Sequence, residues 1–318
     1  MIVRDQLARR LAALLRDDPR RVLLGEDARD GGMLGLTRAC VEDPELEARV
    51  IGTPLVPALA LAHAGGLAIA GLRPIVALPS AAALYEGFAA LRELCRLSLC
   101  TDDERSAPAL LLAPCGPGLG LGGDGADELS SLLAPLSGLR VLACSDPREA
   151  AALVREAAEF TAGEQPTVVL LPRDQLFVDV GDPVDTLEEP VALRRLRHGD
   201  RATVFCWGAA TARALAAVDA LEVAVDVIEL RALSPLDRAG LVAAAARTGK
   251  LVIAHPGPSA FGVAAELAAL FADAAILHLD APVLRVGGEA GPLARDTEGR
   301  ALPSVAAITE AILRVVTF

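Results

Sequence analysis

Residues 53–60 read Thr-Pro-Leu-Val-Pro-Ala-Leu-Ala, and residues 71–74 read Gly-Leu-Arg-Pro. No carboxylate occurs from Ala48 to Tyr85, although the chain has 42 acidic residues among 318. The apolar run that joins the two stretches is almost long enough to span a membrane, but two prolines, a histidine and a pair of glycines interrupt it. We therefore interpret the run as a buried helix of an α/β domain.

Aliphatic residues dominate the composition, because 53% of the chain is hydrophobic but only 3% is aromatic. Alanine-rich helices packed on strands of Val, Ile and Leu have this composition, so it favours an α/β fold. A chain of 318 residues is long enough for two domains, since single cores seldom grow far beyond a couple of hundred residues.

Short apolar runs alternate with helix-period segments along the whole chain. Candidate strands are Arg21–Leu24, Ile75–Leu78, Ala109–Ala113, Arg140–Ala143, Thr167–Leu171, Thr203–Trp207, Val223–Leu230, Leu251–His255 and Val283–Val286. Candidate helices are Arg4–Leu15, Pro57–Ala70, Ala81–Leu97, Ala126–Leu133, Pro147–Phe160, Ala210–Val218, Asp237–Arg247, Phe261–Phe271 and Ser304–Val315. This alternation predicts parallel strands joined by right-handed crossovers. We expect two α/β domains, each a mostly parallel sheet flanked by helices, at residues 1–180 and 196–318, with a linker at residues 181–195.

The charge and the cysteines limit the class of protein. A net charge of −12 argues against nucleic-acid binding, which needs a basic face. The six cysteines have no metal-type spacing and read as small buried hydrophobes in a reducing compartment. The four histidines are isolated, which argues against a metal centre. Because the N-terminus also lacks a signal-peptide pattern, we expect a cytoplasmic protein without a membrane anchor.

A series of short motifs follows one order along the chain. The first domain contains Gly25-Glu26-Asp27, Gly31-Gly32, Thr37-Arg38, Thr53-Pro54, Gly71–Pro74, Pro114-Cys115-Gly116 and Gly138–Val141. The second contains Arg231–Asp237, Phe261-Gly262 through Glu266, Leu279–Val286 and Leu302–Val305. In this order and spacing the set resembles the beta subunit of the E1 component of pyruvate and branched-chain 2-oxo acid dehydrogenases.

The resemblance covers nearly the whole chain and implies its architecture and partners. It implies a transketolase-type pyrimidine-binding domain followed by a transketolase C-terminal domain. Such beta subunits pair with alpha subunits as a heterotetramer, with thiamine diphosphate and Mg²⁺ at the interface, and a lipoyl acyltransferase core is a further implied partner. Self-association as a homodimer is the alternative.

Three positions that match the cofactor site in that family are occupied by unsuitable residues. Pro57 stands where the family has the glutamate that binds the aminopyrimidine and starts the chemistry, and proline has no side-chain donor or acceptor. Ala83 matches the aromatic residue that packs on the aminopyrimidine. Tyr85, two residues on, could replace that ring or belong to the core or an interface. Gly125 matches the histidine of the proton relay.

Three further features need an interpretation. The glycine-rich stretch 116–125 resembles a phosphate loop but lacks the Gly-Lys-Ser/Thr ending, so we expect a flexible loop. His63 lies in the apolar helix, where a satisfied core residue is expected. His255 ends a strand at the place of a family histidine; it is a candidate for a subunit interface, and a structural role is the alternative.

We therefore predict a beta-type subunit that is impaired or silent in thiamine diphosphate chemistry and has no catalytic residue of its own. One alternative is a working thiamine-dependent 2-oxo acid dehydrogenase subunit whose acid comes from elsewhere in the structure. The other is a self-associating, non-enzymatic protein that has lost its alpha partner. The sequence names no substrate.

Overall fold

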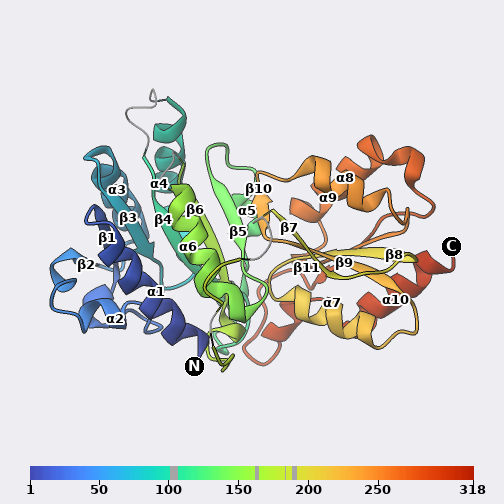
Figure 1. Cartoon of the computed structure of the whole chain (residues 1–318), viewed down its shortest axis with the longest axis horizontal. Coiled ribbons are helices and arrows are strands. Elements are labelled where there is room, and N and C mark those ends of the chain that lie inside the picture. The colour runs from blue at the N-terminus through green and yellow to red at the C-terminus, as the bar shows by residue number, and fades with distance from the viewer. Residues whose placement is uncertain (101–106, 162–164, 183, 188–191) are drawn as a thin grey trace. The chain divides into compact units, whose positions relative to one another are not determined.

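The computed structural model describes residues 1–100, 107–161, 165–182, 184–187 and 192–318 (Figure 1). The chain divides into two compact units. The first unit comprises Met1–Cys115, Pro135–Leu142 and Pro147–Leu187, and the second comprises Gly116–Ala134, Ala143–Asp146 and Glu188–Phe318. A short piece of chain around residue 125 therefore belongs to the second unit, although the predicted boundary places it in the first domain.

The first unit is built on strands in the order β5-β6-β4-β3-β1-β2. Their bounds are β1 Arg21–Glu26, β2 Val50–Thr53, β3 Arg73–Ala77, β4 Leu110–Cys115, β5 Arg140–Ala143 and β6 Thr167–Pro172. The pairs β1–β2, β1–β3, β3–β4 and β4–β6 are parallel. Every residue of β4 and β6 is buried, as expected for strands covered on both faces. The α/β class with a mostly parallel sheet is confirmed.

The helices of this unit are α1 Val3–Asp17, α2 Arg38–Val41, α3 Pro57–Ile69, α4 Ala83–Cys100 and α6 Ala150–Thr161. Helix α3 begins at Pro57, whose missing N–H costs nothing in the first helical turn. It packs against α4 at Gly87, where an added Cβ would lie 2.7 Å from Cδ1 of Leu61. Glycine at this position therefore lets the two helices approach closely.

The interpretation of α3 as a buried helix is wrong in part. One face is buried, but the opposite face exposes Leu59, His63, Gly66 and Ile69. His63 is therefore a surface residue, and the expectation of a core histidine is wrong as well. Within the described ranges, no helix is both long enough and apolar enough to cross a membrane.

The second unit has a smaller sheet in the order β12-β11-β8-β9-β7. Its strands are β7 Leu193–Arg197, β8 Ala202–Cys206, β9 Val225–Leu230, β11 Leu251–Pro258 and β12 Leu284–Gly288. The short strand β10, Ala232–Ser234, is not part of this sheet. Strand β7 runs antiparallel to β9, whereas the other pairs are parallel. β7 overlaps the predicted linker, whose residues 183 and 188–191 lie outside the described part of the chain.

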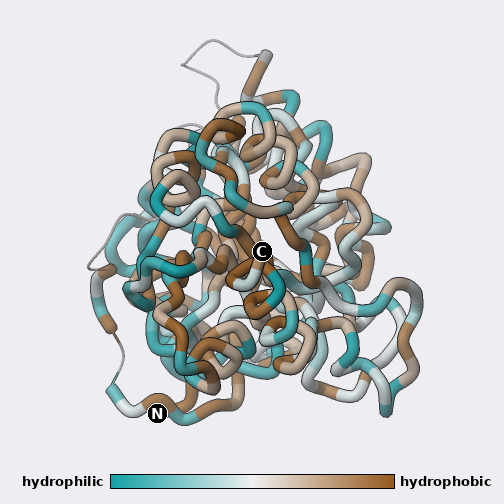
Figure 2. Tube along the Cα trace, turned by 90° about the vertical axis from the view of Figure 1, so that its right-hand side faces the viewer, coloured by the Kyte–Doolittle hydropathy of each residue, from teal (hydrophilic) through white to brown (hydrophobic). Residues whose placement is uncertain are grey.

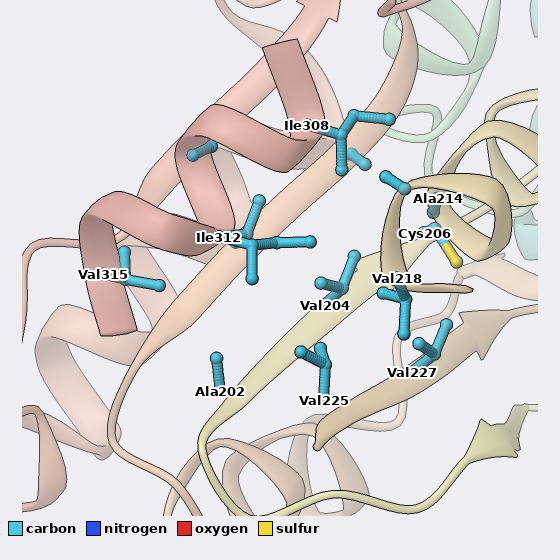
Figure 3. Close-up of a cluster of buried hydrophobic side chains, with 14 of the residues drawn as sticks. Ala202, Val204, Cys206, Ala214, Val218, Val225, Val227, Ile308, Ile312 and Val315 are labelled. Carbon is cyan, nitrogen blue, oxygen red and sulfur yellow. The ribbon is translucent and has the colours of Figure 1, made fainter. Parts of the chain in front are cut away.

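The helices of the second unit are α5 Ser130–Leu133, α7 Ala210–Asp219, α8 Arg238–Ala245, α9 Gly262–Ala274 and α10 Val305–Val316. Side chains from α7 and α10 meet those of the sheet in an aliphatic core that includes Val204, Val227 and Ile312 (Figure 3). In α10, Ile308, Ala311, Ile312 and Val315 are buried, whereas the charged Glu310 and Arg314 are exposed. Figure 2 colours the trace by hydropathy, with hydrophobic residues in brown and hydrophilic residues in teal.

Candidate functional site

A small hollow lies where β1, β2 and β3 end in the first unit. The chain passes from β1 to β2 on one side and then to β3 on the other, so the carboxyl ends of β1 and β3 form a topological switch point. Ligands of open parallel sheets bind in the crevice at such a point. Glu26, Thr53 and Pro57 line the hollow, each from a different element. Its free volume of about 10 Å³ has room for about one water molecule.

Glu26 supplies the one ionisable side chain among the residues that line this hollow. Its Oε2 atom is buried and has no hydrogen-bond partner within the described residues, and the same holds for Oγ1 of Thr53. Burial raises the pKa of the Glu26 carboxyl, and the nearby charge of Asp27 raises it further. A buried polar atom without a partner is costly. Two polar atoms without a hydrogen-bond partner in the described structure, Oε2 of Glu26 and Oγ1 of Thr53, therefore belong to the lining of a hollow whose other residues are mostly apolar.

Pro57 is buried at the start of α3 and contributes only its ring to the hollow. Helix α3 contains no acidic residue, so no side chain of this helix could replace the absent glutamate. The carboxyl in the hollow comes from β1 instead. From the sequence, Gly25-Glu26-Asp27 is a landmark of the fold and Glu26 was not predicted as a site residue, although its place at the end of a strand is a usable signal.

Ala83 and Tyr85 lie in the first turn of α4. Ala83 is partly buried, whereas the side chain of Tyr85 is exposed. Neither residue is among those described as lining the hollow. A methyl group at residue 83 offers no ring surface for stacking. The structure therefore does not bring the two residues into the hollow with Glu26, and a stacking role for Tyr85 stays a prediction.

Gly125 belongs to a glycine-rich loop that the second unit holds in place. The carboxylate of Glu298 accepts hydrogen bonds from the backbone N–H groups of Gly118 and Gly120, both at 2.8 Å, and of Gly122 at 3.2 Å. The N–H of Gly123 donates to the carbonyl of Leu293 at 2.7 Å. The expectation of a flexible loop is therefore wrong, because an internal carboxylate fills the concave side of the backbone.

The backbone at Gly125 leaves no room for a side chain. A Cβ atom added there would lie 2.8 Å from Cβ of Leu121, closer than such atoms approach. The N–H of Gly125 donates to the carbonyl of Gly122 at 3.0 Å, which fixes the turn. The loop is thus built around the small residue and could not hold a histidine at this position without moving Leu121.

Glu128, just after this loop, is a titratable group that was not predicted from the sequence. Oε2 of Glu128 accepts a hydrogen bond from the N–H of Ser130 at 3.0 Å, and its buried Oε1 has no partner within the described residues. Burial raises the pKa of Glu128 to about 8, against the smaller opposing effect of Ser130. Glu128 is therefore largely protonated at neutral pH.

His255 is buried at the carboxyl end of β11, with 2% of its surface exposed. Its ring stacks on that of Trp207 with centroids 5.3 Å apart, and Nδ1 lies 3.0 Å from the carbonyl oxygen of Pro256, the geometry of an Nδ1–H donor. Burial lowers the pKa of His255, so the ring is neutral at physiological pH. The ring is not part of the surface of the isolated chain, and its role at an interface stays a prediction.

The residues at the three matched positions do not fit an aminopyrimidine cofactor that needs a carboxyl partner from α3. Nor does the described part of the chain gather three or more His, Cys, Asp or Glu side chains in a way that could hold a metal ion. What remains at the switch point is the carboxyl of Glu26 and the hydroxyl of Thr53.

Two family models match the chain in succession. The transketolase pyrimidine-binding domain matches residues 1–178, and the transketolase C-terminal domain matches residues 192–308. The beta subunit of the pyruvate dehydrogenase E1 component of Leifsonia xyli subsp. xyli is 32% identical over 281 residues, which cover 85% of this chain and 81% of that protein. The 3-methyl-2-oxobutanoate dehydrogenase subunit beta of Mycobacterium tuberculosis is 30% identical over 85% of this chain and 79% of its own length.

Solved structures share the two-domain architecture. A split-gene transketolase described as an inactive beta4 tetramer superposes with a TM-score of 0.76 and 21% identity, covering 100% of this chain and 98% of that one. Transketolase from Leishmania mexicana superposes with a TM-score of 0.70 and 16% identity, covering 99% of this chain and 45% of that one. At these identities the likeness concerns the fold alone.

Proposed function

Because this chain belongs to the family of beta subunits of the E1 component of 2-oxo acid dehydrogenases, we propose that it assembles as a beta-type subunit that is impaired or silent in thiamine diphosphate chemistry. The family depends on thiamine diphosphate. The observation that carries the proposal is Pro57, which occupies the first turn of α3 at the position of the activating glutamate. The subunit would then contribute to the structure or the regulation of the assembly.

Two positions, one in each unit, support an impaired site. The activating group must be a carboxylic acid that can share a proton with the aminopyrimidine, and α3, which begins at Pro57, has none. The proton relay needs an ionisable group, which the order of motifs puts at residue 125, where a side chain could be added only if Leu121 moved. A chain that had lost a single group could compensate for it. Losses in both units argue for a site no longer maintained for this chemistry.

The exposed face of α3 supports assembly with another chain. Leu59 and Ile69 are 49% and 54% exposed, and the loop before the helix adds Leu55 and Val56 at 66% and 46%. No residue of α3 is charged. Contiguous apolar surface of this kind marks protein–protein contact. An alpha-type subunit is the partner that the family implies, and self-association is the alternative, the state described for the split-gene transketolase.

The proposal is tested by co-expressing the chain with an alpha-type partner and titrating the purified assembly with thiamine diphosphate and Mg²⁺ in a calorimeter. We expect no turnover of 2-oxo acids and no binding that depends on this subunit's hollow. Pro57→Glu should restore measurable cofactor binding, whereas the control Ala58→Glu, the same acid one residue further along α3, should not. Thiamine-dependent turnover by the unmodified assembly would overturn the proposal.

One observation favours the second candidate, a working thiamine-dependent subunit with an atypical acid. The carboxyl of Glu26 faces the same hollow as Pro57, has a raised pKa and has an oxygen without a partner in the described structure. These are properties of a group that can hold a proton for a ligand. If the assembly is active, Glu26→Gln should lower kcat at least about a hundredfold, and Glu26→Asp should retain part of the activity. An active assembly that is indifferent to Glu26→Gln would exclude Glu26 as the acid.

A further inference from the structure

A second and larger hollow lies in the second unit, between α8 and the strands β7 and β9, and has a free volume of about 280 Å³. It exists because the helix presents small residues to the strands. Gly240, Ala243 and Ala244 follow the spacing of one helical face. Gly240 is constrained, since an added Cβ would collide with the carboxylate of Asp237, which caps α8 by accepting the N–H of Gly240.

Two arginines on the wall of this hollow share a single carboxylate. Nε of Arg195 lies 3.0 Å from Oδ1 of Asp226, and Nε of Arg247 lies 3.4 Å from Oδ2 of the same residue. Asp226 is fully buried, whereas the side chains of Arg195 and Arg247 are 32% and 44% exposed. Asp226 pairs with both guanidinium groups, and Nη2 of Arg247 also donates to the carbonyl of Gly199 at 2.8 Å, so the two cations share one buried carboxylate.

A third arginine, Arg194, also lines the hollow, and its Nη1 lies 3.7 Å from Oδ2 of Asp146 and 3.8 Å from Oε2 of Glu229. The other lining residues are apolar, with Leu193 from β7 and Ile228 from β9 beside the small residues of α8. Arg195 is the cross-strand neighbour of Ile228, so the charged and the apolar parts adjoin on one face of the sheet. Ligand sites typically combine such apolar walls with a few polar groups that fix the orientation of the ligand.

Protection of a sheet edge is the simplest other explanation for arginines on β7, because charged residues on an edge strand prevent pairing with another chain. Edge protection requires charges in solvent. Arg195 instead pairs with a fully buried carboxylate, and Arg247 comes from the segment after α8 rather than from the edge strand. Protection of the sheet edge therefore does not explain why Arg195 and Arg247, from two different segments, both pair with Asp226.

We propose that this hollow binds a short-chain aliphatic carboxylate. Its carboxylate would lie between the guanidinium groups of Arg195 and Arg247, which match carboxylate oxygens in geometry and charge. Its alkyl group would lie against Leu193, Ile228 and Ala243. The site is distinct from the hollow beside Pro57 and does not depend on the function proposed above.

The test uses the purified full chain in a buffer of low chloride, titrated with isovalerate and followed by two-dimensional NMR and by thermal melting. We expect saturable binding of isovalerate, with no saturation by isovaleramide, which has the same shape without the charge. Inorganic phosphate should bind more weakly than isovalerate. Equal responses to isovalerate and isovaleramide, or tighter binding of phosphate, would overturn the proposal.

Two pairs of variants separate the hollow from general effects. Ala243→Leu fills the hollow without changing charge and should weaken isovalerate binding at least about tenfold, whereas Ala216→Leu on the exposed face of α7 should leave it unchanged. Arg247→Gln should weaken binding about tenfold or more, the effect of losing one charged hydrogen bond. Arg238→Gln, an exposed arginine of α8 that does not line the hollow, is its control. Isovalerate binding that survives both Ala243→Leu and Arg247→Gln in folded protein would place the ligand elsewhere.

Discussion

Two glutamates of the molecule have opposite environments: Glu26 lines the hollow beside Pro57, and Glu298 binds the backbone of the glycine-rich loop at residues 116–125. Burial alone would raise the pKa of Glu298, but the backbone N–H groups of the loop outweigh it and hold the pKa below its ordinary value. Glu26 has an oxygen without a partner among the described residues, and its pKa is raised. The carboxylate of Glu298 therefore stabilises the loop, whereas the carboxyl of Glu26 is available to a ligand.

Removing the satisfied carboxylate should have the largest effect. Glu298→Ala leaves three N–H groups of the loop without their acceptor, and we expect the free energy of unfolding to fall by ~2–4 kcal/mol, as measured by urea denaturation at pH 7. Glu298→Gln should lower the free energy of unfolding by about half of that amount. Glu289→Ala, which removes an exposed ion pair with Arg300, is the control and should cost less than ~0.5 kcal/mol. Equal effects of Glu298→Ala and Glu289→Ala would show that Glu298 stabilises the fold no more than an exposed ion pair does.

The stabilisation by Glu298 should change in one direction as the pH falls. Because the pKa of Glu298 is lowered in the folded protein, its stabilisation is complete above the ordinary carboxyl pKa and is lost as the pH falls through the folded value. The stability difference between the unmodified chain and Glu298→Gln should therefore shrink below about pH 4. A difference that stays constant down to acid unfolding would contradict this assignment.

Glu128 tests whether the number of hydrogen bonds sets the direction in which the pKa of a carboxyl shifts. Its folded pKa of about 8 means that the folded state holds a proton that the unfolded state has lost, so stability should fall as the pH rises from about 4.5 to about 8. Glu128→Gln should remove this loss. The free energy of unfolding of the variant, relative to that of the unmodified chain, should be ~1–3 kcal/mol higher at pH 9 than at pH 5. Asp124→Asn, an exposed acid of the glycine-rich loop, serves as the matched change and should show no such difference.

Glu26→Gln should have the smallest effect on stability. No hydrogen bond of the buried oxygen is lost, and the cost of ionising a partly buried carboxyl is removed, so we expect a gain below ~1 kcal/mol at pH 8. Asp27→Asn, an exposed neighbour, should change stability by less still. A clear destabilisation by Glu26→Gln would show that its carboxylate has a structural partner, and the contrast with Glu298 would then disappear.

The sequence predicted the strands that are long, apolar and fully buried, because a continuous run of Val, Ile and Leu has no other stable place. It failed at β2 and β7. β2 has four residues with one exposed glycine, and β7 consists largely of arginines, so neither has the pattern of a buried strand. The predicted helix over residues 57–70 was correct in place, but its surface depends on which neighbours cover it, and sequence period alone did not reveal the exposed face.

The candidate site was predictable only in part for a similar reason. Pro57, Ala83 and Gly125 follow from the order of motifs along the chain. Glu26 enters the hollow because β1, β2 and α3 converge, and Glu298 reaches the glycine-rich loop across a separation of about 180 residues. Such contacts depend on the folded topology. Glu26 has a local signal, its place at the end of a strand, whereas no local pattern indicates Glu298.

The crowding at Gly125 has a consequence for anyone who redesigns this chain. A histidine could be introduced at position 125 only if Leu121 and the turn that contains it moved as well, because the added Cβ would lie 2.8 Å from Cβ of Leu121. Moving the turn would disturb the backbone groups that bind Glu298. A redesign of this position would therefore have to change Leu121 in the same step.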